Sequence, residues 1–133
     1  MKAVKARIVK SLNHAALIPV CDNSGAKVIR LISVKGHKTV RRRIQAAGVG
    51  DLIKASVVKG NPTMRKQVVD AIIVRQRKEY RRFDGTRIKF EDNAAVVLKD
   101  EKGNPKGTIL KGAIAKEATE RWPGIAKLAT IVV

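Results

Sequence analysis

Residues 71–98 read AIIVRQRKEYRRFDGTRIKFEDNAAVVL, in which two apolar runs enclose a basic segment. The first run, 71–74, is rich in β-branched residues and too short for a typical helix, so it predicts a buried strand. The second run, 94–98, predicts the returning strand. Asp84-Gly85 lies between the runs and predicts a tight turn, because glycine accepts a positive φ that a side chain resists. The stretch therefore predicts a β-hairpin with a basic tip.

The basic segment, 75–89, carries seven lysines and arginines, and five of them are arginines. These charges cannot all be buried, because an unpaired buried charge is costly, so the strand must leave the core and present them to a negative partner. Guanidinium groups favour bidentate contacts with phosphate. The residues predicted here to bind a nucleic-acid backbone are Arg75, Arg77, Lys78, Arg81, Arg82 and Arg87.

A second basic cluster occupies 35–43, within a stretch from 23 to 50 that contains no acidic residue. It has neither helical nor strand periodicity, which predicts an exposed loop or the tip of a ribbon. A solvated surface normally mixes acids with bases, so a concentrated basic patch indicates a nucleic-acid partner. Recognition of backbone and folded shape is favoured over sequence readout. The cations of this cluster are Lys35, Lys38, Arg41, Arg42 and Arg43.

Composition agrees with this interpretation. With 133 residues, 44% of them hydrophobic, the chain has the material for one folded domain, which we expect to span 1–133. A formal net charge of +18 favours a polyanionic partner. The lone Cys21 excludes an intramolecular disulfide and indicates a reducing cytoplasm. No apolar run approaches the roughly 18 residues of a membrane span, so we expect no membrane partner.

Short apolar runs separated by turn signals fill the rest of 1–111. A turn at 22–25 is expected to join two neighbouring strands, and Gly60-Asn61-Pro62 breaks another. Short strands at this regular spacing indicate an all-β barrel or sandwich. Outside the central hairpin, strands are expected at 6–9, 17–20, 27–34, 52–58 and 108–110.

The last segment, 112–133, changes to a helical period. Ile114, Ala118 and Trp122 fall on one helical stripe, and Pro123 predicts that the helix ends at Trp122. The stripe is expected to cover one end of the barrel. A mixture of charge signs on the opposite face suits a protein partner better than bare RNA. That face is expected to carry Lys116, Glu117, Glu120 and Arg121.

Nothing in the sequence favours catalysis or metal binding. Cys21 and either His14 or His37 are the only conceivable nucleophile and base, and a cysteine in an apolar run is expected to be buried. The histidines and Cys21 lack metal-ligand spacing, and adjacent Glu91 and Asp92 point to opposite faces of a strand. We therefore expect no catalytic residue, no metal and no cofactor, and a protein that is not an enzyme.

The four aromatic residues are Tyr80, Phe83, Phe90 and Trp122, whereas a platform for single-stranded RNA needs several exposed rings on one sheet face. We expect Tyr80 and Phe83 to cover apolar surface at the base of the ribbon, with stacking on a splayed base as the alternative, and Phe90 to lie in the core. The alternative is a free barrel-type single-strand RNA-binding or RNA-chaperone factor. The scarcity of aromatic residues counts against it.

A spaced set of residues in the hairpin has the form of a family signature: Ala71, Ile72, Ile73, Val74, Asp84, Gly85, Phe90, Asn93, Val96 and Val97. This pattern resembles that of the large-subunit ribosomal protein fourteen family, in which Asp84, Gly85, Phe90 and Asn93 would be structural. The resemblance extends to 21–27, 46–51, 115–117 and Trp122-Pro123. The N-terminal strand, 75–78 and 117–123 resemble the archaeal and eukaryotic type.

The resemblance implies a small five-stranded β-barrel with a projecting β-ribbon and a short C-terminal helical segment. It also implies a non-catalytic constituent of the cytoplasmic large ribosomal subunit, which binds large-subunit rRNA and contributes to intersubunit bridges with small-subunit rRNA. The implied neighbours are ribosomal protein three and L-twenty-four-e, and an anti-association initiation factor is the implied partner of the C-terminal region. The implied bridge or partner face comprises Arg65, Lys66, Lys116, Glu120 and Arg121. Ala113 departs from the family pattern, which usually has proline there.

Overall fold

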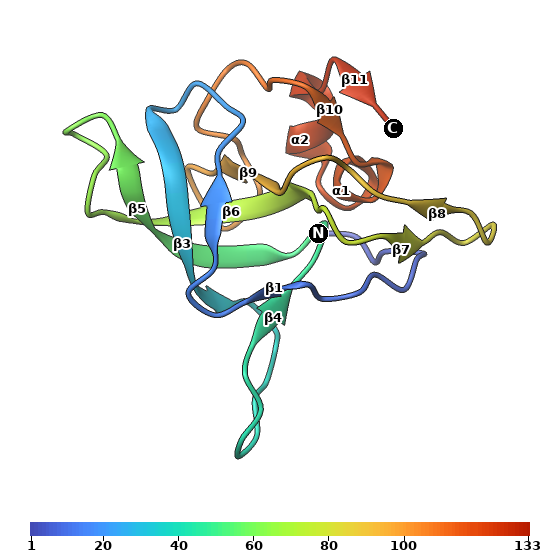
Figure 1. Cartoon of the computed structure of the whole chain (residues 1–133). Coiled ribbons are helices and arrows are strands. Elements are labelled where there is room, and N and C mark those ends of the chain that lie inside the picture. The colour runs from blue at the N-terminus through green and yellow to red at the C-terminus, as the bar shows by residue number, and fades with distance from the viewer.

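The computed structural model describes all residues from 1 to 133, and short strands dominate it (Figure 1). The strands are β1 (Leu12–Asn13), β2 (Leu17–Pro19), β3 (Ala26–Val34), β4 (Ala46–Ala47), β5 (Leu52–Gly60), β6 (Val68–Arg75), β7 (Tyr80–Arg81), β8 (Arg87–Ile88), β9 (Ala94–Val97), β10 (Ala113–Ile114) and β11 (Ile131–Val132). The helices are α1 (Lys116–Arg121) and α2 (Pro123–Leu128). Neither helix has the length and apolar character that crossing a membrane requires.

The main sheet is antiparallel and has five strands in the order β2-β3-β5-β6-β9. The predicted hairpin forms its last pair, with Ala71 opposite Val97 and Ile73 opposite Ala95. The predicted turn at 22–25 joins β2 to β3, which pair as antiparallel neighbours. Both predictions are confirmed, and the fold is mainly β.

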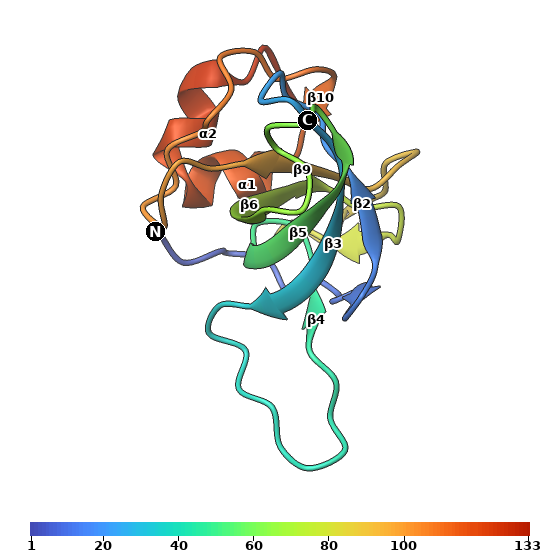
Figure 2. The ribbon, with the colours of Figure 1, turned by 90° about the vertical axis from the view of Figure 1, so that its left-hand side faces the viewer.

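Strand β6 is covered on both faces. Ala71 and Ile73 belong to one buried apolar cluster, while Ile72 and Val74 belong to a second cluster that includes Trp122. Because successive strand residues point to opposite faces, the whole run must be apolar. Helices α1 and α2 lie together on one side of the sheet and supply part of the second cluster (Figure 2).

Two predicted strands are wrong. Residues 6–9 are not in a strand; instead the Val9 carbonyl accepts a 3.3 Å hydrogen bond from the Gln76 side chain. A side-chain contact thus replaces the backbone ladder there. No strand forms at 108–110 either, where Leu110 makes only an isolated bridge to Asp22.

The C-terminal helix is shorter than predicted. Ile114 lies in β10 and pairs with Val132, so α1 begins at Lys116. The predicted stripe is nevertheless buried, with Ile114 and Ala118 at 0% and Trp122 at 2% exposure. Pro123 opens α2 directly after Trp122, as the predicted helix end requires.

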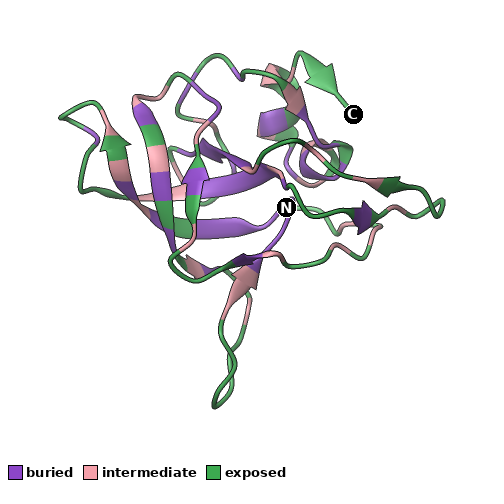
Figure 3. Cartoon of the chain, in the orientation of Figure 1, coloured by how far each residue is buried: buried purple, intermediate pink, exposed green.

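Burial is concentrated in the sheet and around α1, and several exposed segments leave this body, two of them longer than the others (Figure 3). One is the β3–β4 loop, residues 35–45, and the other is the β7–β8 hairpin, residues 77–89. Each projection carries one of the two predicted basic clusters.

Candidate nucleic-acid interface

The β3–β4 loop is fixed at its base and open at its tip. Gln45 accepts the Val34 backbone N–H at 3.0 Å and donates to the His37 carbonyl at 3.0 Å. The His37 ring lies 3.1 Å from the Ala46 carbonyl oxygen. Beyond these contacts the loop turns back at Arg42, whose φ is +66°, and the whole stretch 38–44 is exposed. The predicted exposed loop is confirmed.

The cations at the tip of this loop have no acidic partner. Lys38, Arg41, Arg42 and Arg43 form no ion pair within 4.0 Å, whereas Lys35 lies 2.7 Å from Glu101. Four unneutralised charges on one short loop create a local positive potential in solvent. That is the arrangement with which proteins bind phosphate backbones.

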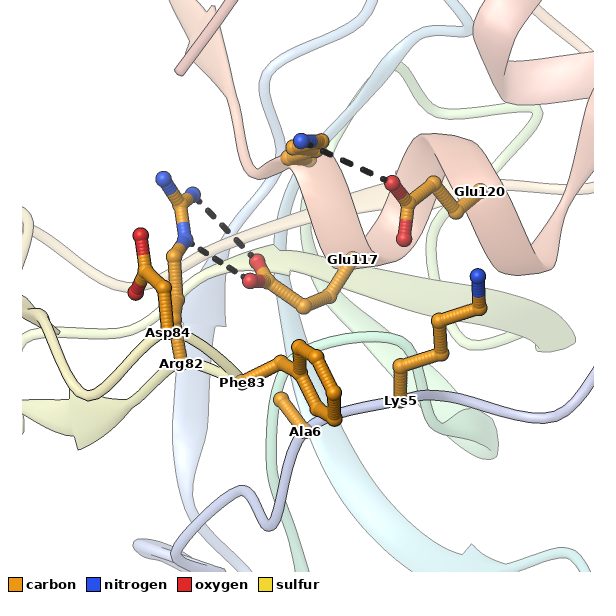
Figure 4. Close-up of a pocket in the computed structure, with 8 residues that line it drawn as sticks. Lys5, Ala6, Arg82, Phe83, Asp84, Glu117 and Glu120 are labelled. Carbon is orange, nitrogen blue, oxygen red and sulfur yellow. Dashed lines mark hydrogen bonds and ion pairs between the residues drawn. The ribbon is translucent and has the colours of Figure 1, made fainter.

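The β7–β8 hairpin is attached to α1 by a buried carboxylate (Figure 4). Glu117, 5% exposed, accepts a 2.7 Å hydrogen bond from the Tyr80 hydroxyl and a 2.8 Å bond from Arg82 Nε. Burial, followed by the bond to Glu117, raises the pKa of Tyr80 above its usual range. Tyr80 is therefore a neutral donor that fixes the root of the hairpin.

Two predicted phosphate-binding arginines are engaged within the protein. Arg75 pairs with Asp92 at 3.0 Å and donates to the carbonyls of Lys111 and Ala113 at 3.0 and 2.8 Å. Arg82 pairs with Glu117. Both contacts hold segments of this chain together, and phosphate binding by either arginine stays a prediction.

The remaining predicted cations of the hairpin point away from the core. Arg77, Lys78 and Arg81 are exposed and form no ion pair, while Arg87 lies 3.3 Å from Glu79. Their binding to RNA stays a prediction.

The turn at the tip of the hairpin is confirmed. Gly85 has a φ of +90°, and the Asp84 carboxylate accepts hydrogen bonds from the Thr86 hydroxyl and backbone N–H at 2.7 and 3.0 Å. These bonds hold the pKa of Asp84 below its usual range. Asn93 accepts the Arg77 backbone N–H at 2.8 Å and so closes the base of the hairpin.

The aromatic residues do not form a stacking platform. Tyr80 and Trp122 are buried, Phe90 is half-buried against the second cluster, and Phe83 is 85% exposed. The expectation for Phe83 is wrong, because its ring lines an open and mostly polar pocket beside Lys5 and Arg82 (Figure 4). One exposed ring does not supply the several stacking positions of a single-strand binder.

The predicted outer face of α1 is divided differently from the expectation. Glu117 is buried, and Arg121 is half-buried and lies 3.3 Å from Asp51. Lys116 and Glu120 are exposed and lie 3.9 Å apart. Glu117 is buried because the β7–β8 hairpin packs against this side of α1 and supplies Tyr80 and Arg82 as its hydrogen-bond donors.

The other members of the predicted partner face lie elsewhere. Arg65 and Lys66 occupy the β5–β6 turn, at the end of the sheet opposite the β7–β8 hairpin (Figure 1). The structure therefore does not bring them together with Lys116 and Glu120.

One cluster was not predicted. Lys10 of the N-terminal segment lies 2.6 Å from Asp51, which also pairs with Arg121. The sequence holds one faint signal, since Asp51 is the first acidic residue after the acid-free stretch from 23 to 50. Nothing local indicates its two partners.

The structure offers no reactive cysteine. Cys21 is buried, and burial raises the pKa of its thiol to about 11, so it is protonated at neutral pH. No group of three or more potential metal ligands lies together.

Known proteins place these features in a family. Residues 11–133 match the family described as ribosomal protein L14p/L23e. The chain is 56% identical over 133 residues to the large ribosomal subunit protein uL14 of Nanoarchaeum equitans, covering 100% of both chains. It is 53% and 54% identical over 132 residues to the uL14 proteins of Methanococcus vannielii and Methanococcus maripaludis, covering 99% of each. The resemblance seen in the hairpin is thus confirmed along the chain, which belongs to the ribosomal protein L14p/L23e family.

Proposed function

We propose that the chain is a structural constituent of the cytoplasmic large ribosomal subunit and binds large-subunit rRNA through the β3–β4 loop and the β7–β8 hairpin. The names of its relatives support the assignment to the large subunit. The observation that carries rRNA binding is the set of four exposed, unpaired cations at the tip of the β3–β4 loop. Membership in a ribosomal protein family also confirms the prediction that the chain is not an enzyme.

The two projections suggest how binding works. Their bases are fixed by Gln45 and by Glu117, so the basic tips extend from a folded body at defined positions. Phosphate contacts at two separate tips set the orientation of the protein on a folded RNA without reading its sequence. The absence of a stacking platform makes the alternative, a free single-strand RNA-binding or RNA-chaperone factor, the weaker proposal.

Sedimentation of a cell lysate in high salt distinguishes the ribosomal constituent from the free RNA-binding factor. A subunit constituent should comigrate with the large subunit in high salt, because several separate contacts with the rRNA would hold it on the particle. Release of the protein as a free species under conditions that leave the other large-subunit proteins bound would overturn the proposal.

We further propose that Lys116 and Glu120 belong to a surface for protein partners. They are exposed, of opposite sign, and lie on the face of α1 turned away from the core. The family suggests the anti-association initiation factor, ribosomal protein three or L-twenty-four-e as occupants. Arg65 and Lys66, at the far end of the sheet, suit a separate contact such as a bridge to small-subunit rRNA. Arg121 does not suit the partner surface, because it is turned toward Asp51.

We also propose that the five-stranded sheet closes into a barrel and that residues 1–133 form one domain. Its edge strands β2 and β9 approach each other: Val20 and Ala95 form a parallel bridge, and the Cys21 N–H donates to the Ala95 carbonyl at 3.1 Å. Closure would remove both exposed edges of the sheet. Slow hydrogen exchange at the Cys21 amide, comparable to that of β6 amides, would support closure, and rapid exchange would contradict it.

A further inference from the structure

A groove lies at the base of the β3–β4 loop, away from its tip. Its volume is about 560 Å³, and four lysine or arginine side chains line it together with one carboxylate. Lys35 and Lys38 come from the loop, Lys10 from the N-terminal segment, and Arg121 from α1; Asp51 is the carboxylate. Lys35 is paired with Glu101 at 2.7 Å, so the excess of positive charge in the groove comes from Lys10, Lys38 and Arg121, which lie in three separate parts of the chain.

Asp51 positions two of these cations without neutralising both. Its carboxylate lies 2.6 Å from Lys10 Nζ and 3.3 Å from Arg121 Nη1, and it also accepts the Gly48 backbone N–H at 2.8 Å. With only 7% of Asp51 exposed, its negative charge is fixed beneath the groove. One positive charge of this triad remains unbalanced.

Arg121 has few acceptors within the protein. A guanidinium group offers five N–H donors. Here its bond to Asp51 is long, Nη2 reaches only the Met1 sulfur at 3.2 Å, and buried Nε has no hydrogen-bond partner. Thioether sulfur is a weak acceptor. Nε is too buried to meet an external group, but 22% of the side chain is exposed, so Arg121 is held in place while its outer N–H donors retain capacity for an external acceptor.

We propose that this surface, the Lys10–Arg121 groove, binds a phosphodiester segment of RNA, with Lys10 and Arg121 contacting its non-bridging oxygens. The inference rests on the proposed function and adds to the RNA-binding surface Lys10 and Arg121, which belong to neither basic cluster of the sequence. Phosphate offers the acceptors that a guanidinium and an ammonium satisfy together. The β3–β4 loop supplies cations both to the groove and to its own tip, so one RNA strand can follow the loop from Arg41 to Lys10.

The test compares two double variants that each remove two positive charges. Lys10→Gln with Arg121→Gln alters the groove, and Lys111→Gln with Lys127→Gln removes exposed charges that do not line it. Binding to refolded large-subunit rRNA is measured by filter retention over a series of KCl concentrations. Each lost phosphate contact lowers the slope of log Kobs against log salt by roughly 0.7 to 0.9, so the groove variant should lose about 1 to 2 and the control less than about 0.5. Equal slopes for the two variants would contradict the proposal that the groove binds RNA.

Further variants separate folding from binding. Lys10→Arg and Arg121→Lys retain charge and should retain the wild-type slope; a flattened slope in both would show that these residues act only through folding. The single variant Lys10→Gln leaves the Arg121–Asp51 pair in place. If the groove binds RNA, this variant should still lower the slope of log Kobs against log salt by the amount expected for about one phosphate contact.

The same assay distinguishes failure of the groove from failure of the proposed function. If Arg41→Ala, Arg42→Ala and Arg43→Ala together flatten the slope while the groove variants do not, the groove proposal is wrong and rRNA binding stands. If the wild-type protein shows no salt-dependent binding to the rRNA, both are wrong. If the groove variants bind rRNA normally but are incorporated less into particles, the groove contacts a carboxylate of a neighbouring protein. That result also contradicts the inference.

Discussion

Tyr80 and Glu117 are 37 residues apart in the chain, and the Tyr80 hydroxyl donates a buried 2.7 Å hydrogen bond to the Glu117 carboxylate. Arg82, on the same hairpin, reaches the other carboxylate oxygen at 2.8 Å. It also donates to the Val133 carbonyl. Glu117 therefore joins the base of the β7–β8 hairpin to α1, and Arg82 links the same site to Val133.

Glu117→Gln should lower the free energy of unfolding by about 1 to 3 kcal/mol, because a neutral amide cannot accept fully from both Tyr80 and Arg82. Glu120→Gln, on the exposed face of the same helix, is the matched control and should cost less than about 0.5 kcal/mol. Urea unfolding measures both. Equal losses for the two variants would show that the buried carboxylate does not stabilise the hairpin.

The same contact predicts a pH dependence. Burial and Glu117 raise the pKa of Tyr80 in the folded protein, whereas the unfolded value is about 10. A raised folded pKa means that the folded chain holds this proton more tightly, so the stabilisation is complete below about pH 10 and declines as pH rises further. The difference in unfolding free energy between wild type and Tyr80→Phe should be constant from pH 7 to 9 and change above pH 10, with wild type losing stability. A difference that is constant up to pH 11 would contradict this.

Gly85→Val should destabilise the protein by about 1 kcal/mol or more, because a β-branched residue resists the φ of +90° at this turn. A Cβ at Gly85 would meet no atom within 4 Å, so the cost is one of backbone conformation and not of collision. Gly85→Asn is the control, since asparagine tolerates positive φ better than other residues. Thermal unfolding measures both, and equal midpoints for valine and asparagine would remove the turn assignment.

Lys116→Glu should leave folding and rRNA incorporation intact while weakening the association of a protein partner. Lys116 is exposed and its only ion pair, with Glu120, is long at 3.9 Å, so little stability is at stake. Lys127→Glu on α2 reverses another exposed charge and serves as the control. Reconstitution of particles with each variant measures folding and rRNA incorporation through the yield of complete particles, and partner association through binding to them. Loss of incorporation for Lys116→Glu alone would show that this face contacts RNA.

Much of the fold is encoded locally. The run at 71–74 is apolar throughout because both faces of β6 are buried, and that pattern is readable from the sequence. The Asp84-Gly85 turn is likewise local, since its conformation depends on one glycine and one neighbouring carboxylate. The exposed β3–β4 loop follows from a stretch of charge without periodicity.

What the sequence did not reveal depends on contacts between distant residues. Glu117 is buried because Tyr80 and Arg82 satisfy it, and Arg75 is occupied because Asp92 and two carbonyls lie around it. An amphipathic pattern assigns a charged residue to the outside without information about such partners. The Lys10–Asp51 pair, 41 residues apart, is hidden for the same reason.

The central claim is that the tip of the β3–β4 loop binds phosphate, and its most direct test is the salt dependence of rRNA binding after Arg41→Ala, Arg42→Ala and Arg43→Ala. None of the three side chains has an acidic partner in the protein, so stability should change by less than about 0.5 kcal/mol. Because each phosphate contact contributes roughly 0.7 to 0.9 to the slope of log Kobs against log salt, we predict a slope reduced by about 2 to 3 with weaker binding at every salt concentration. An unchanged slope in a folded triple variant would contradict the account.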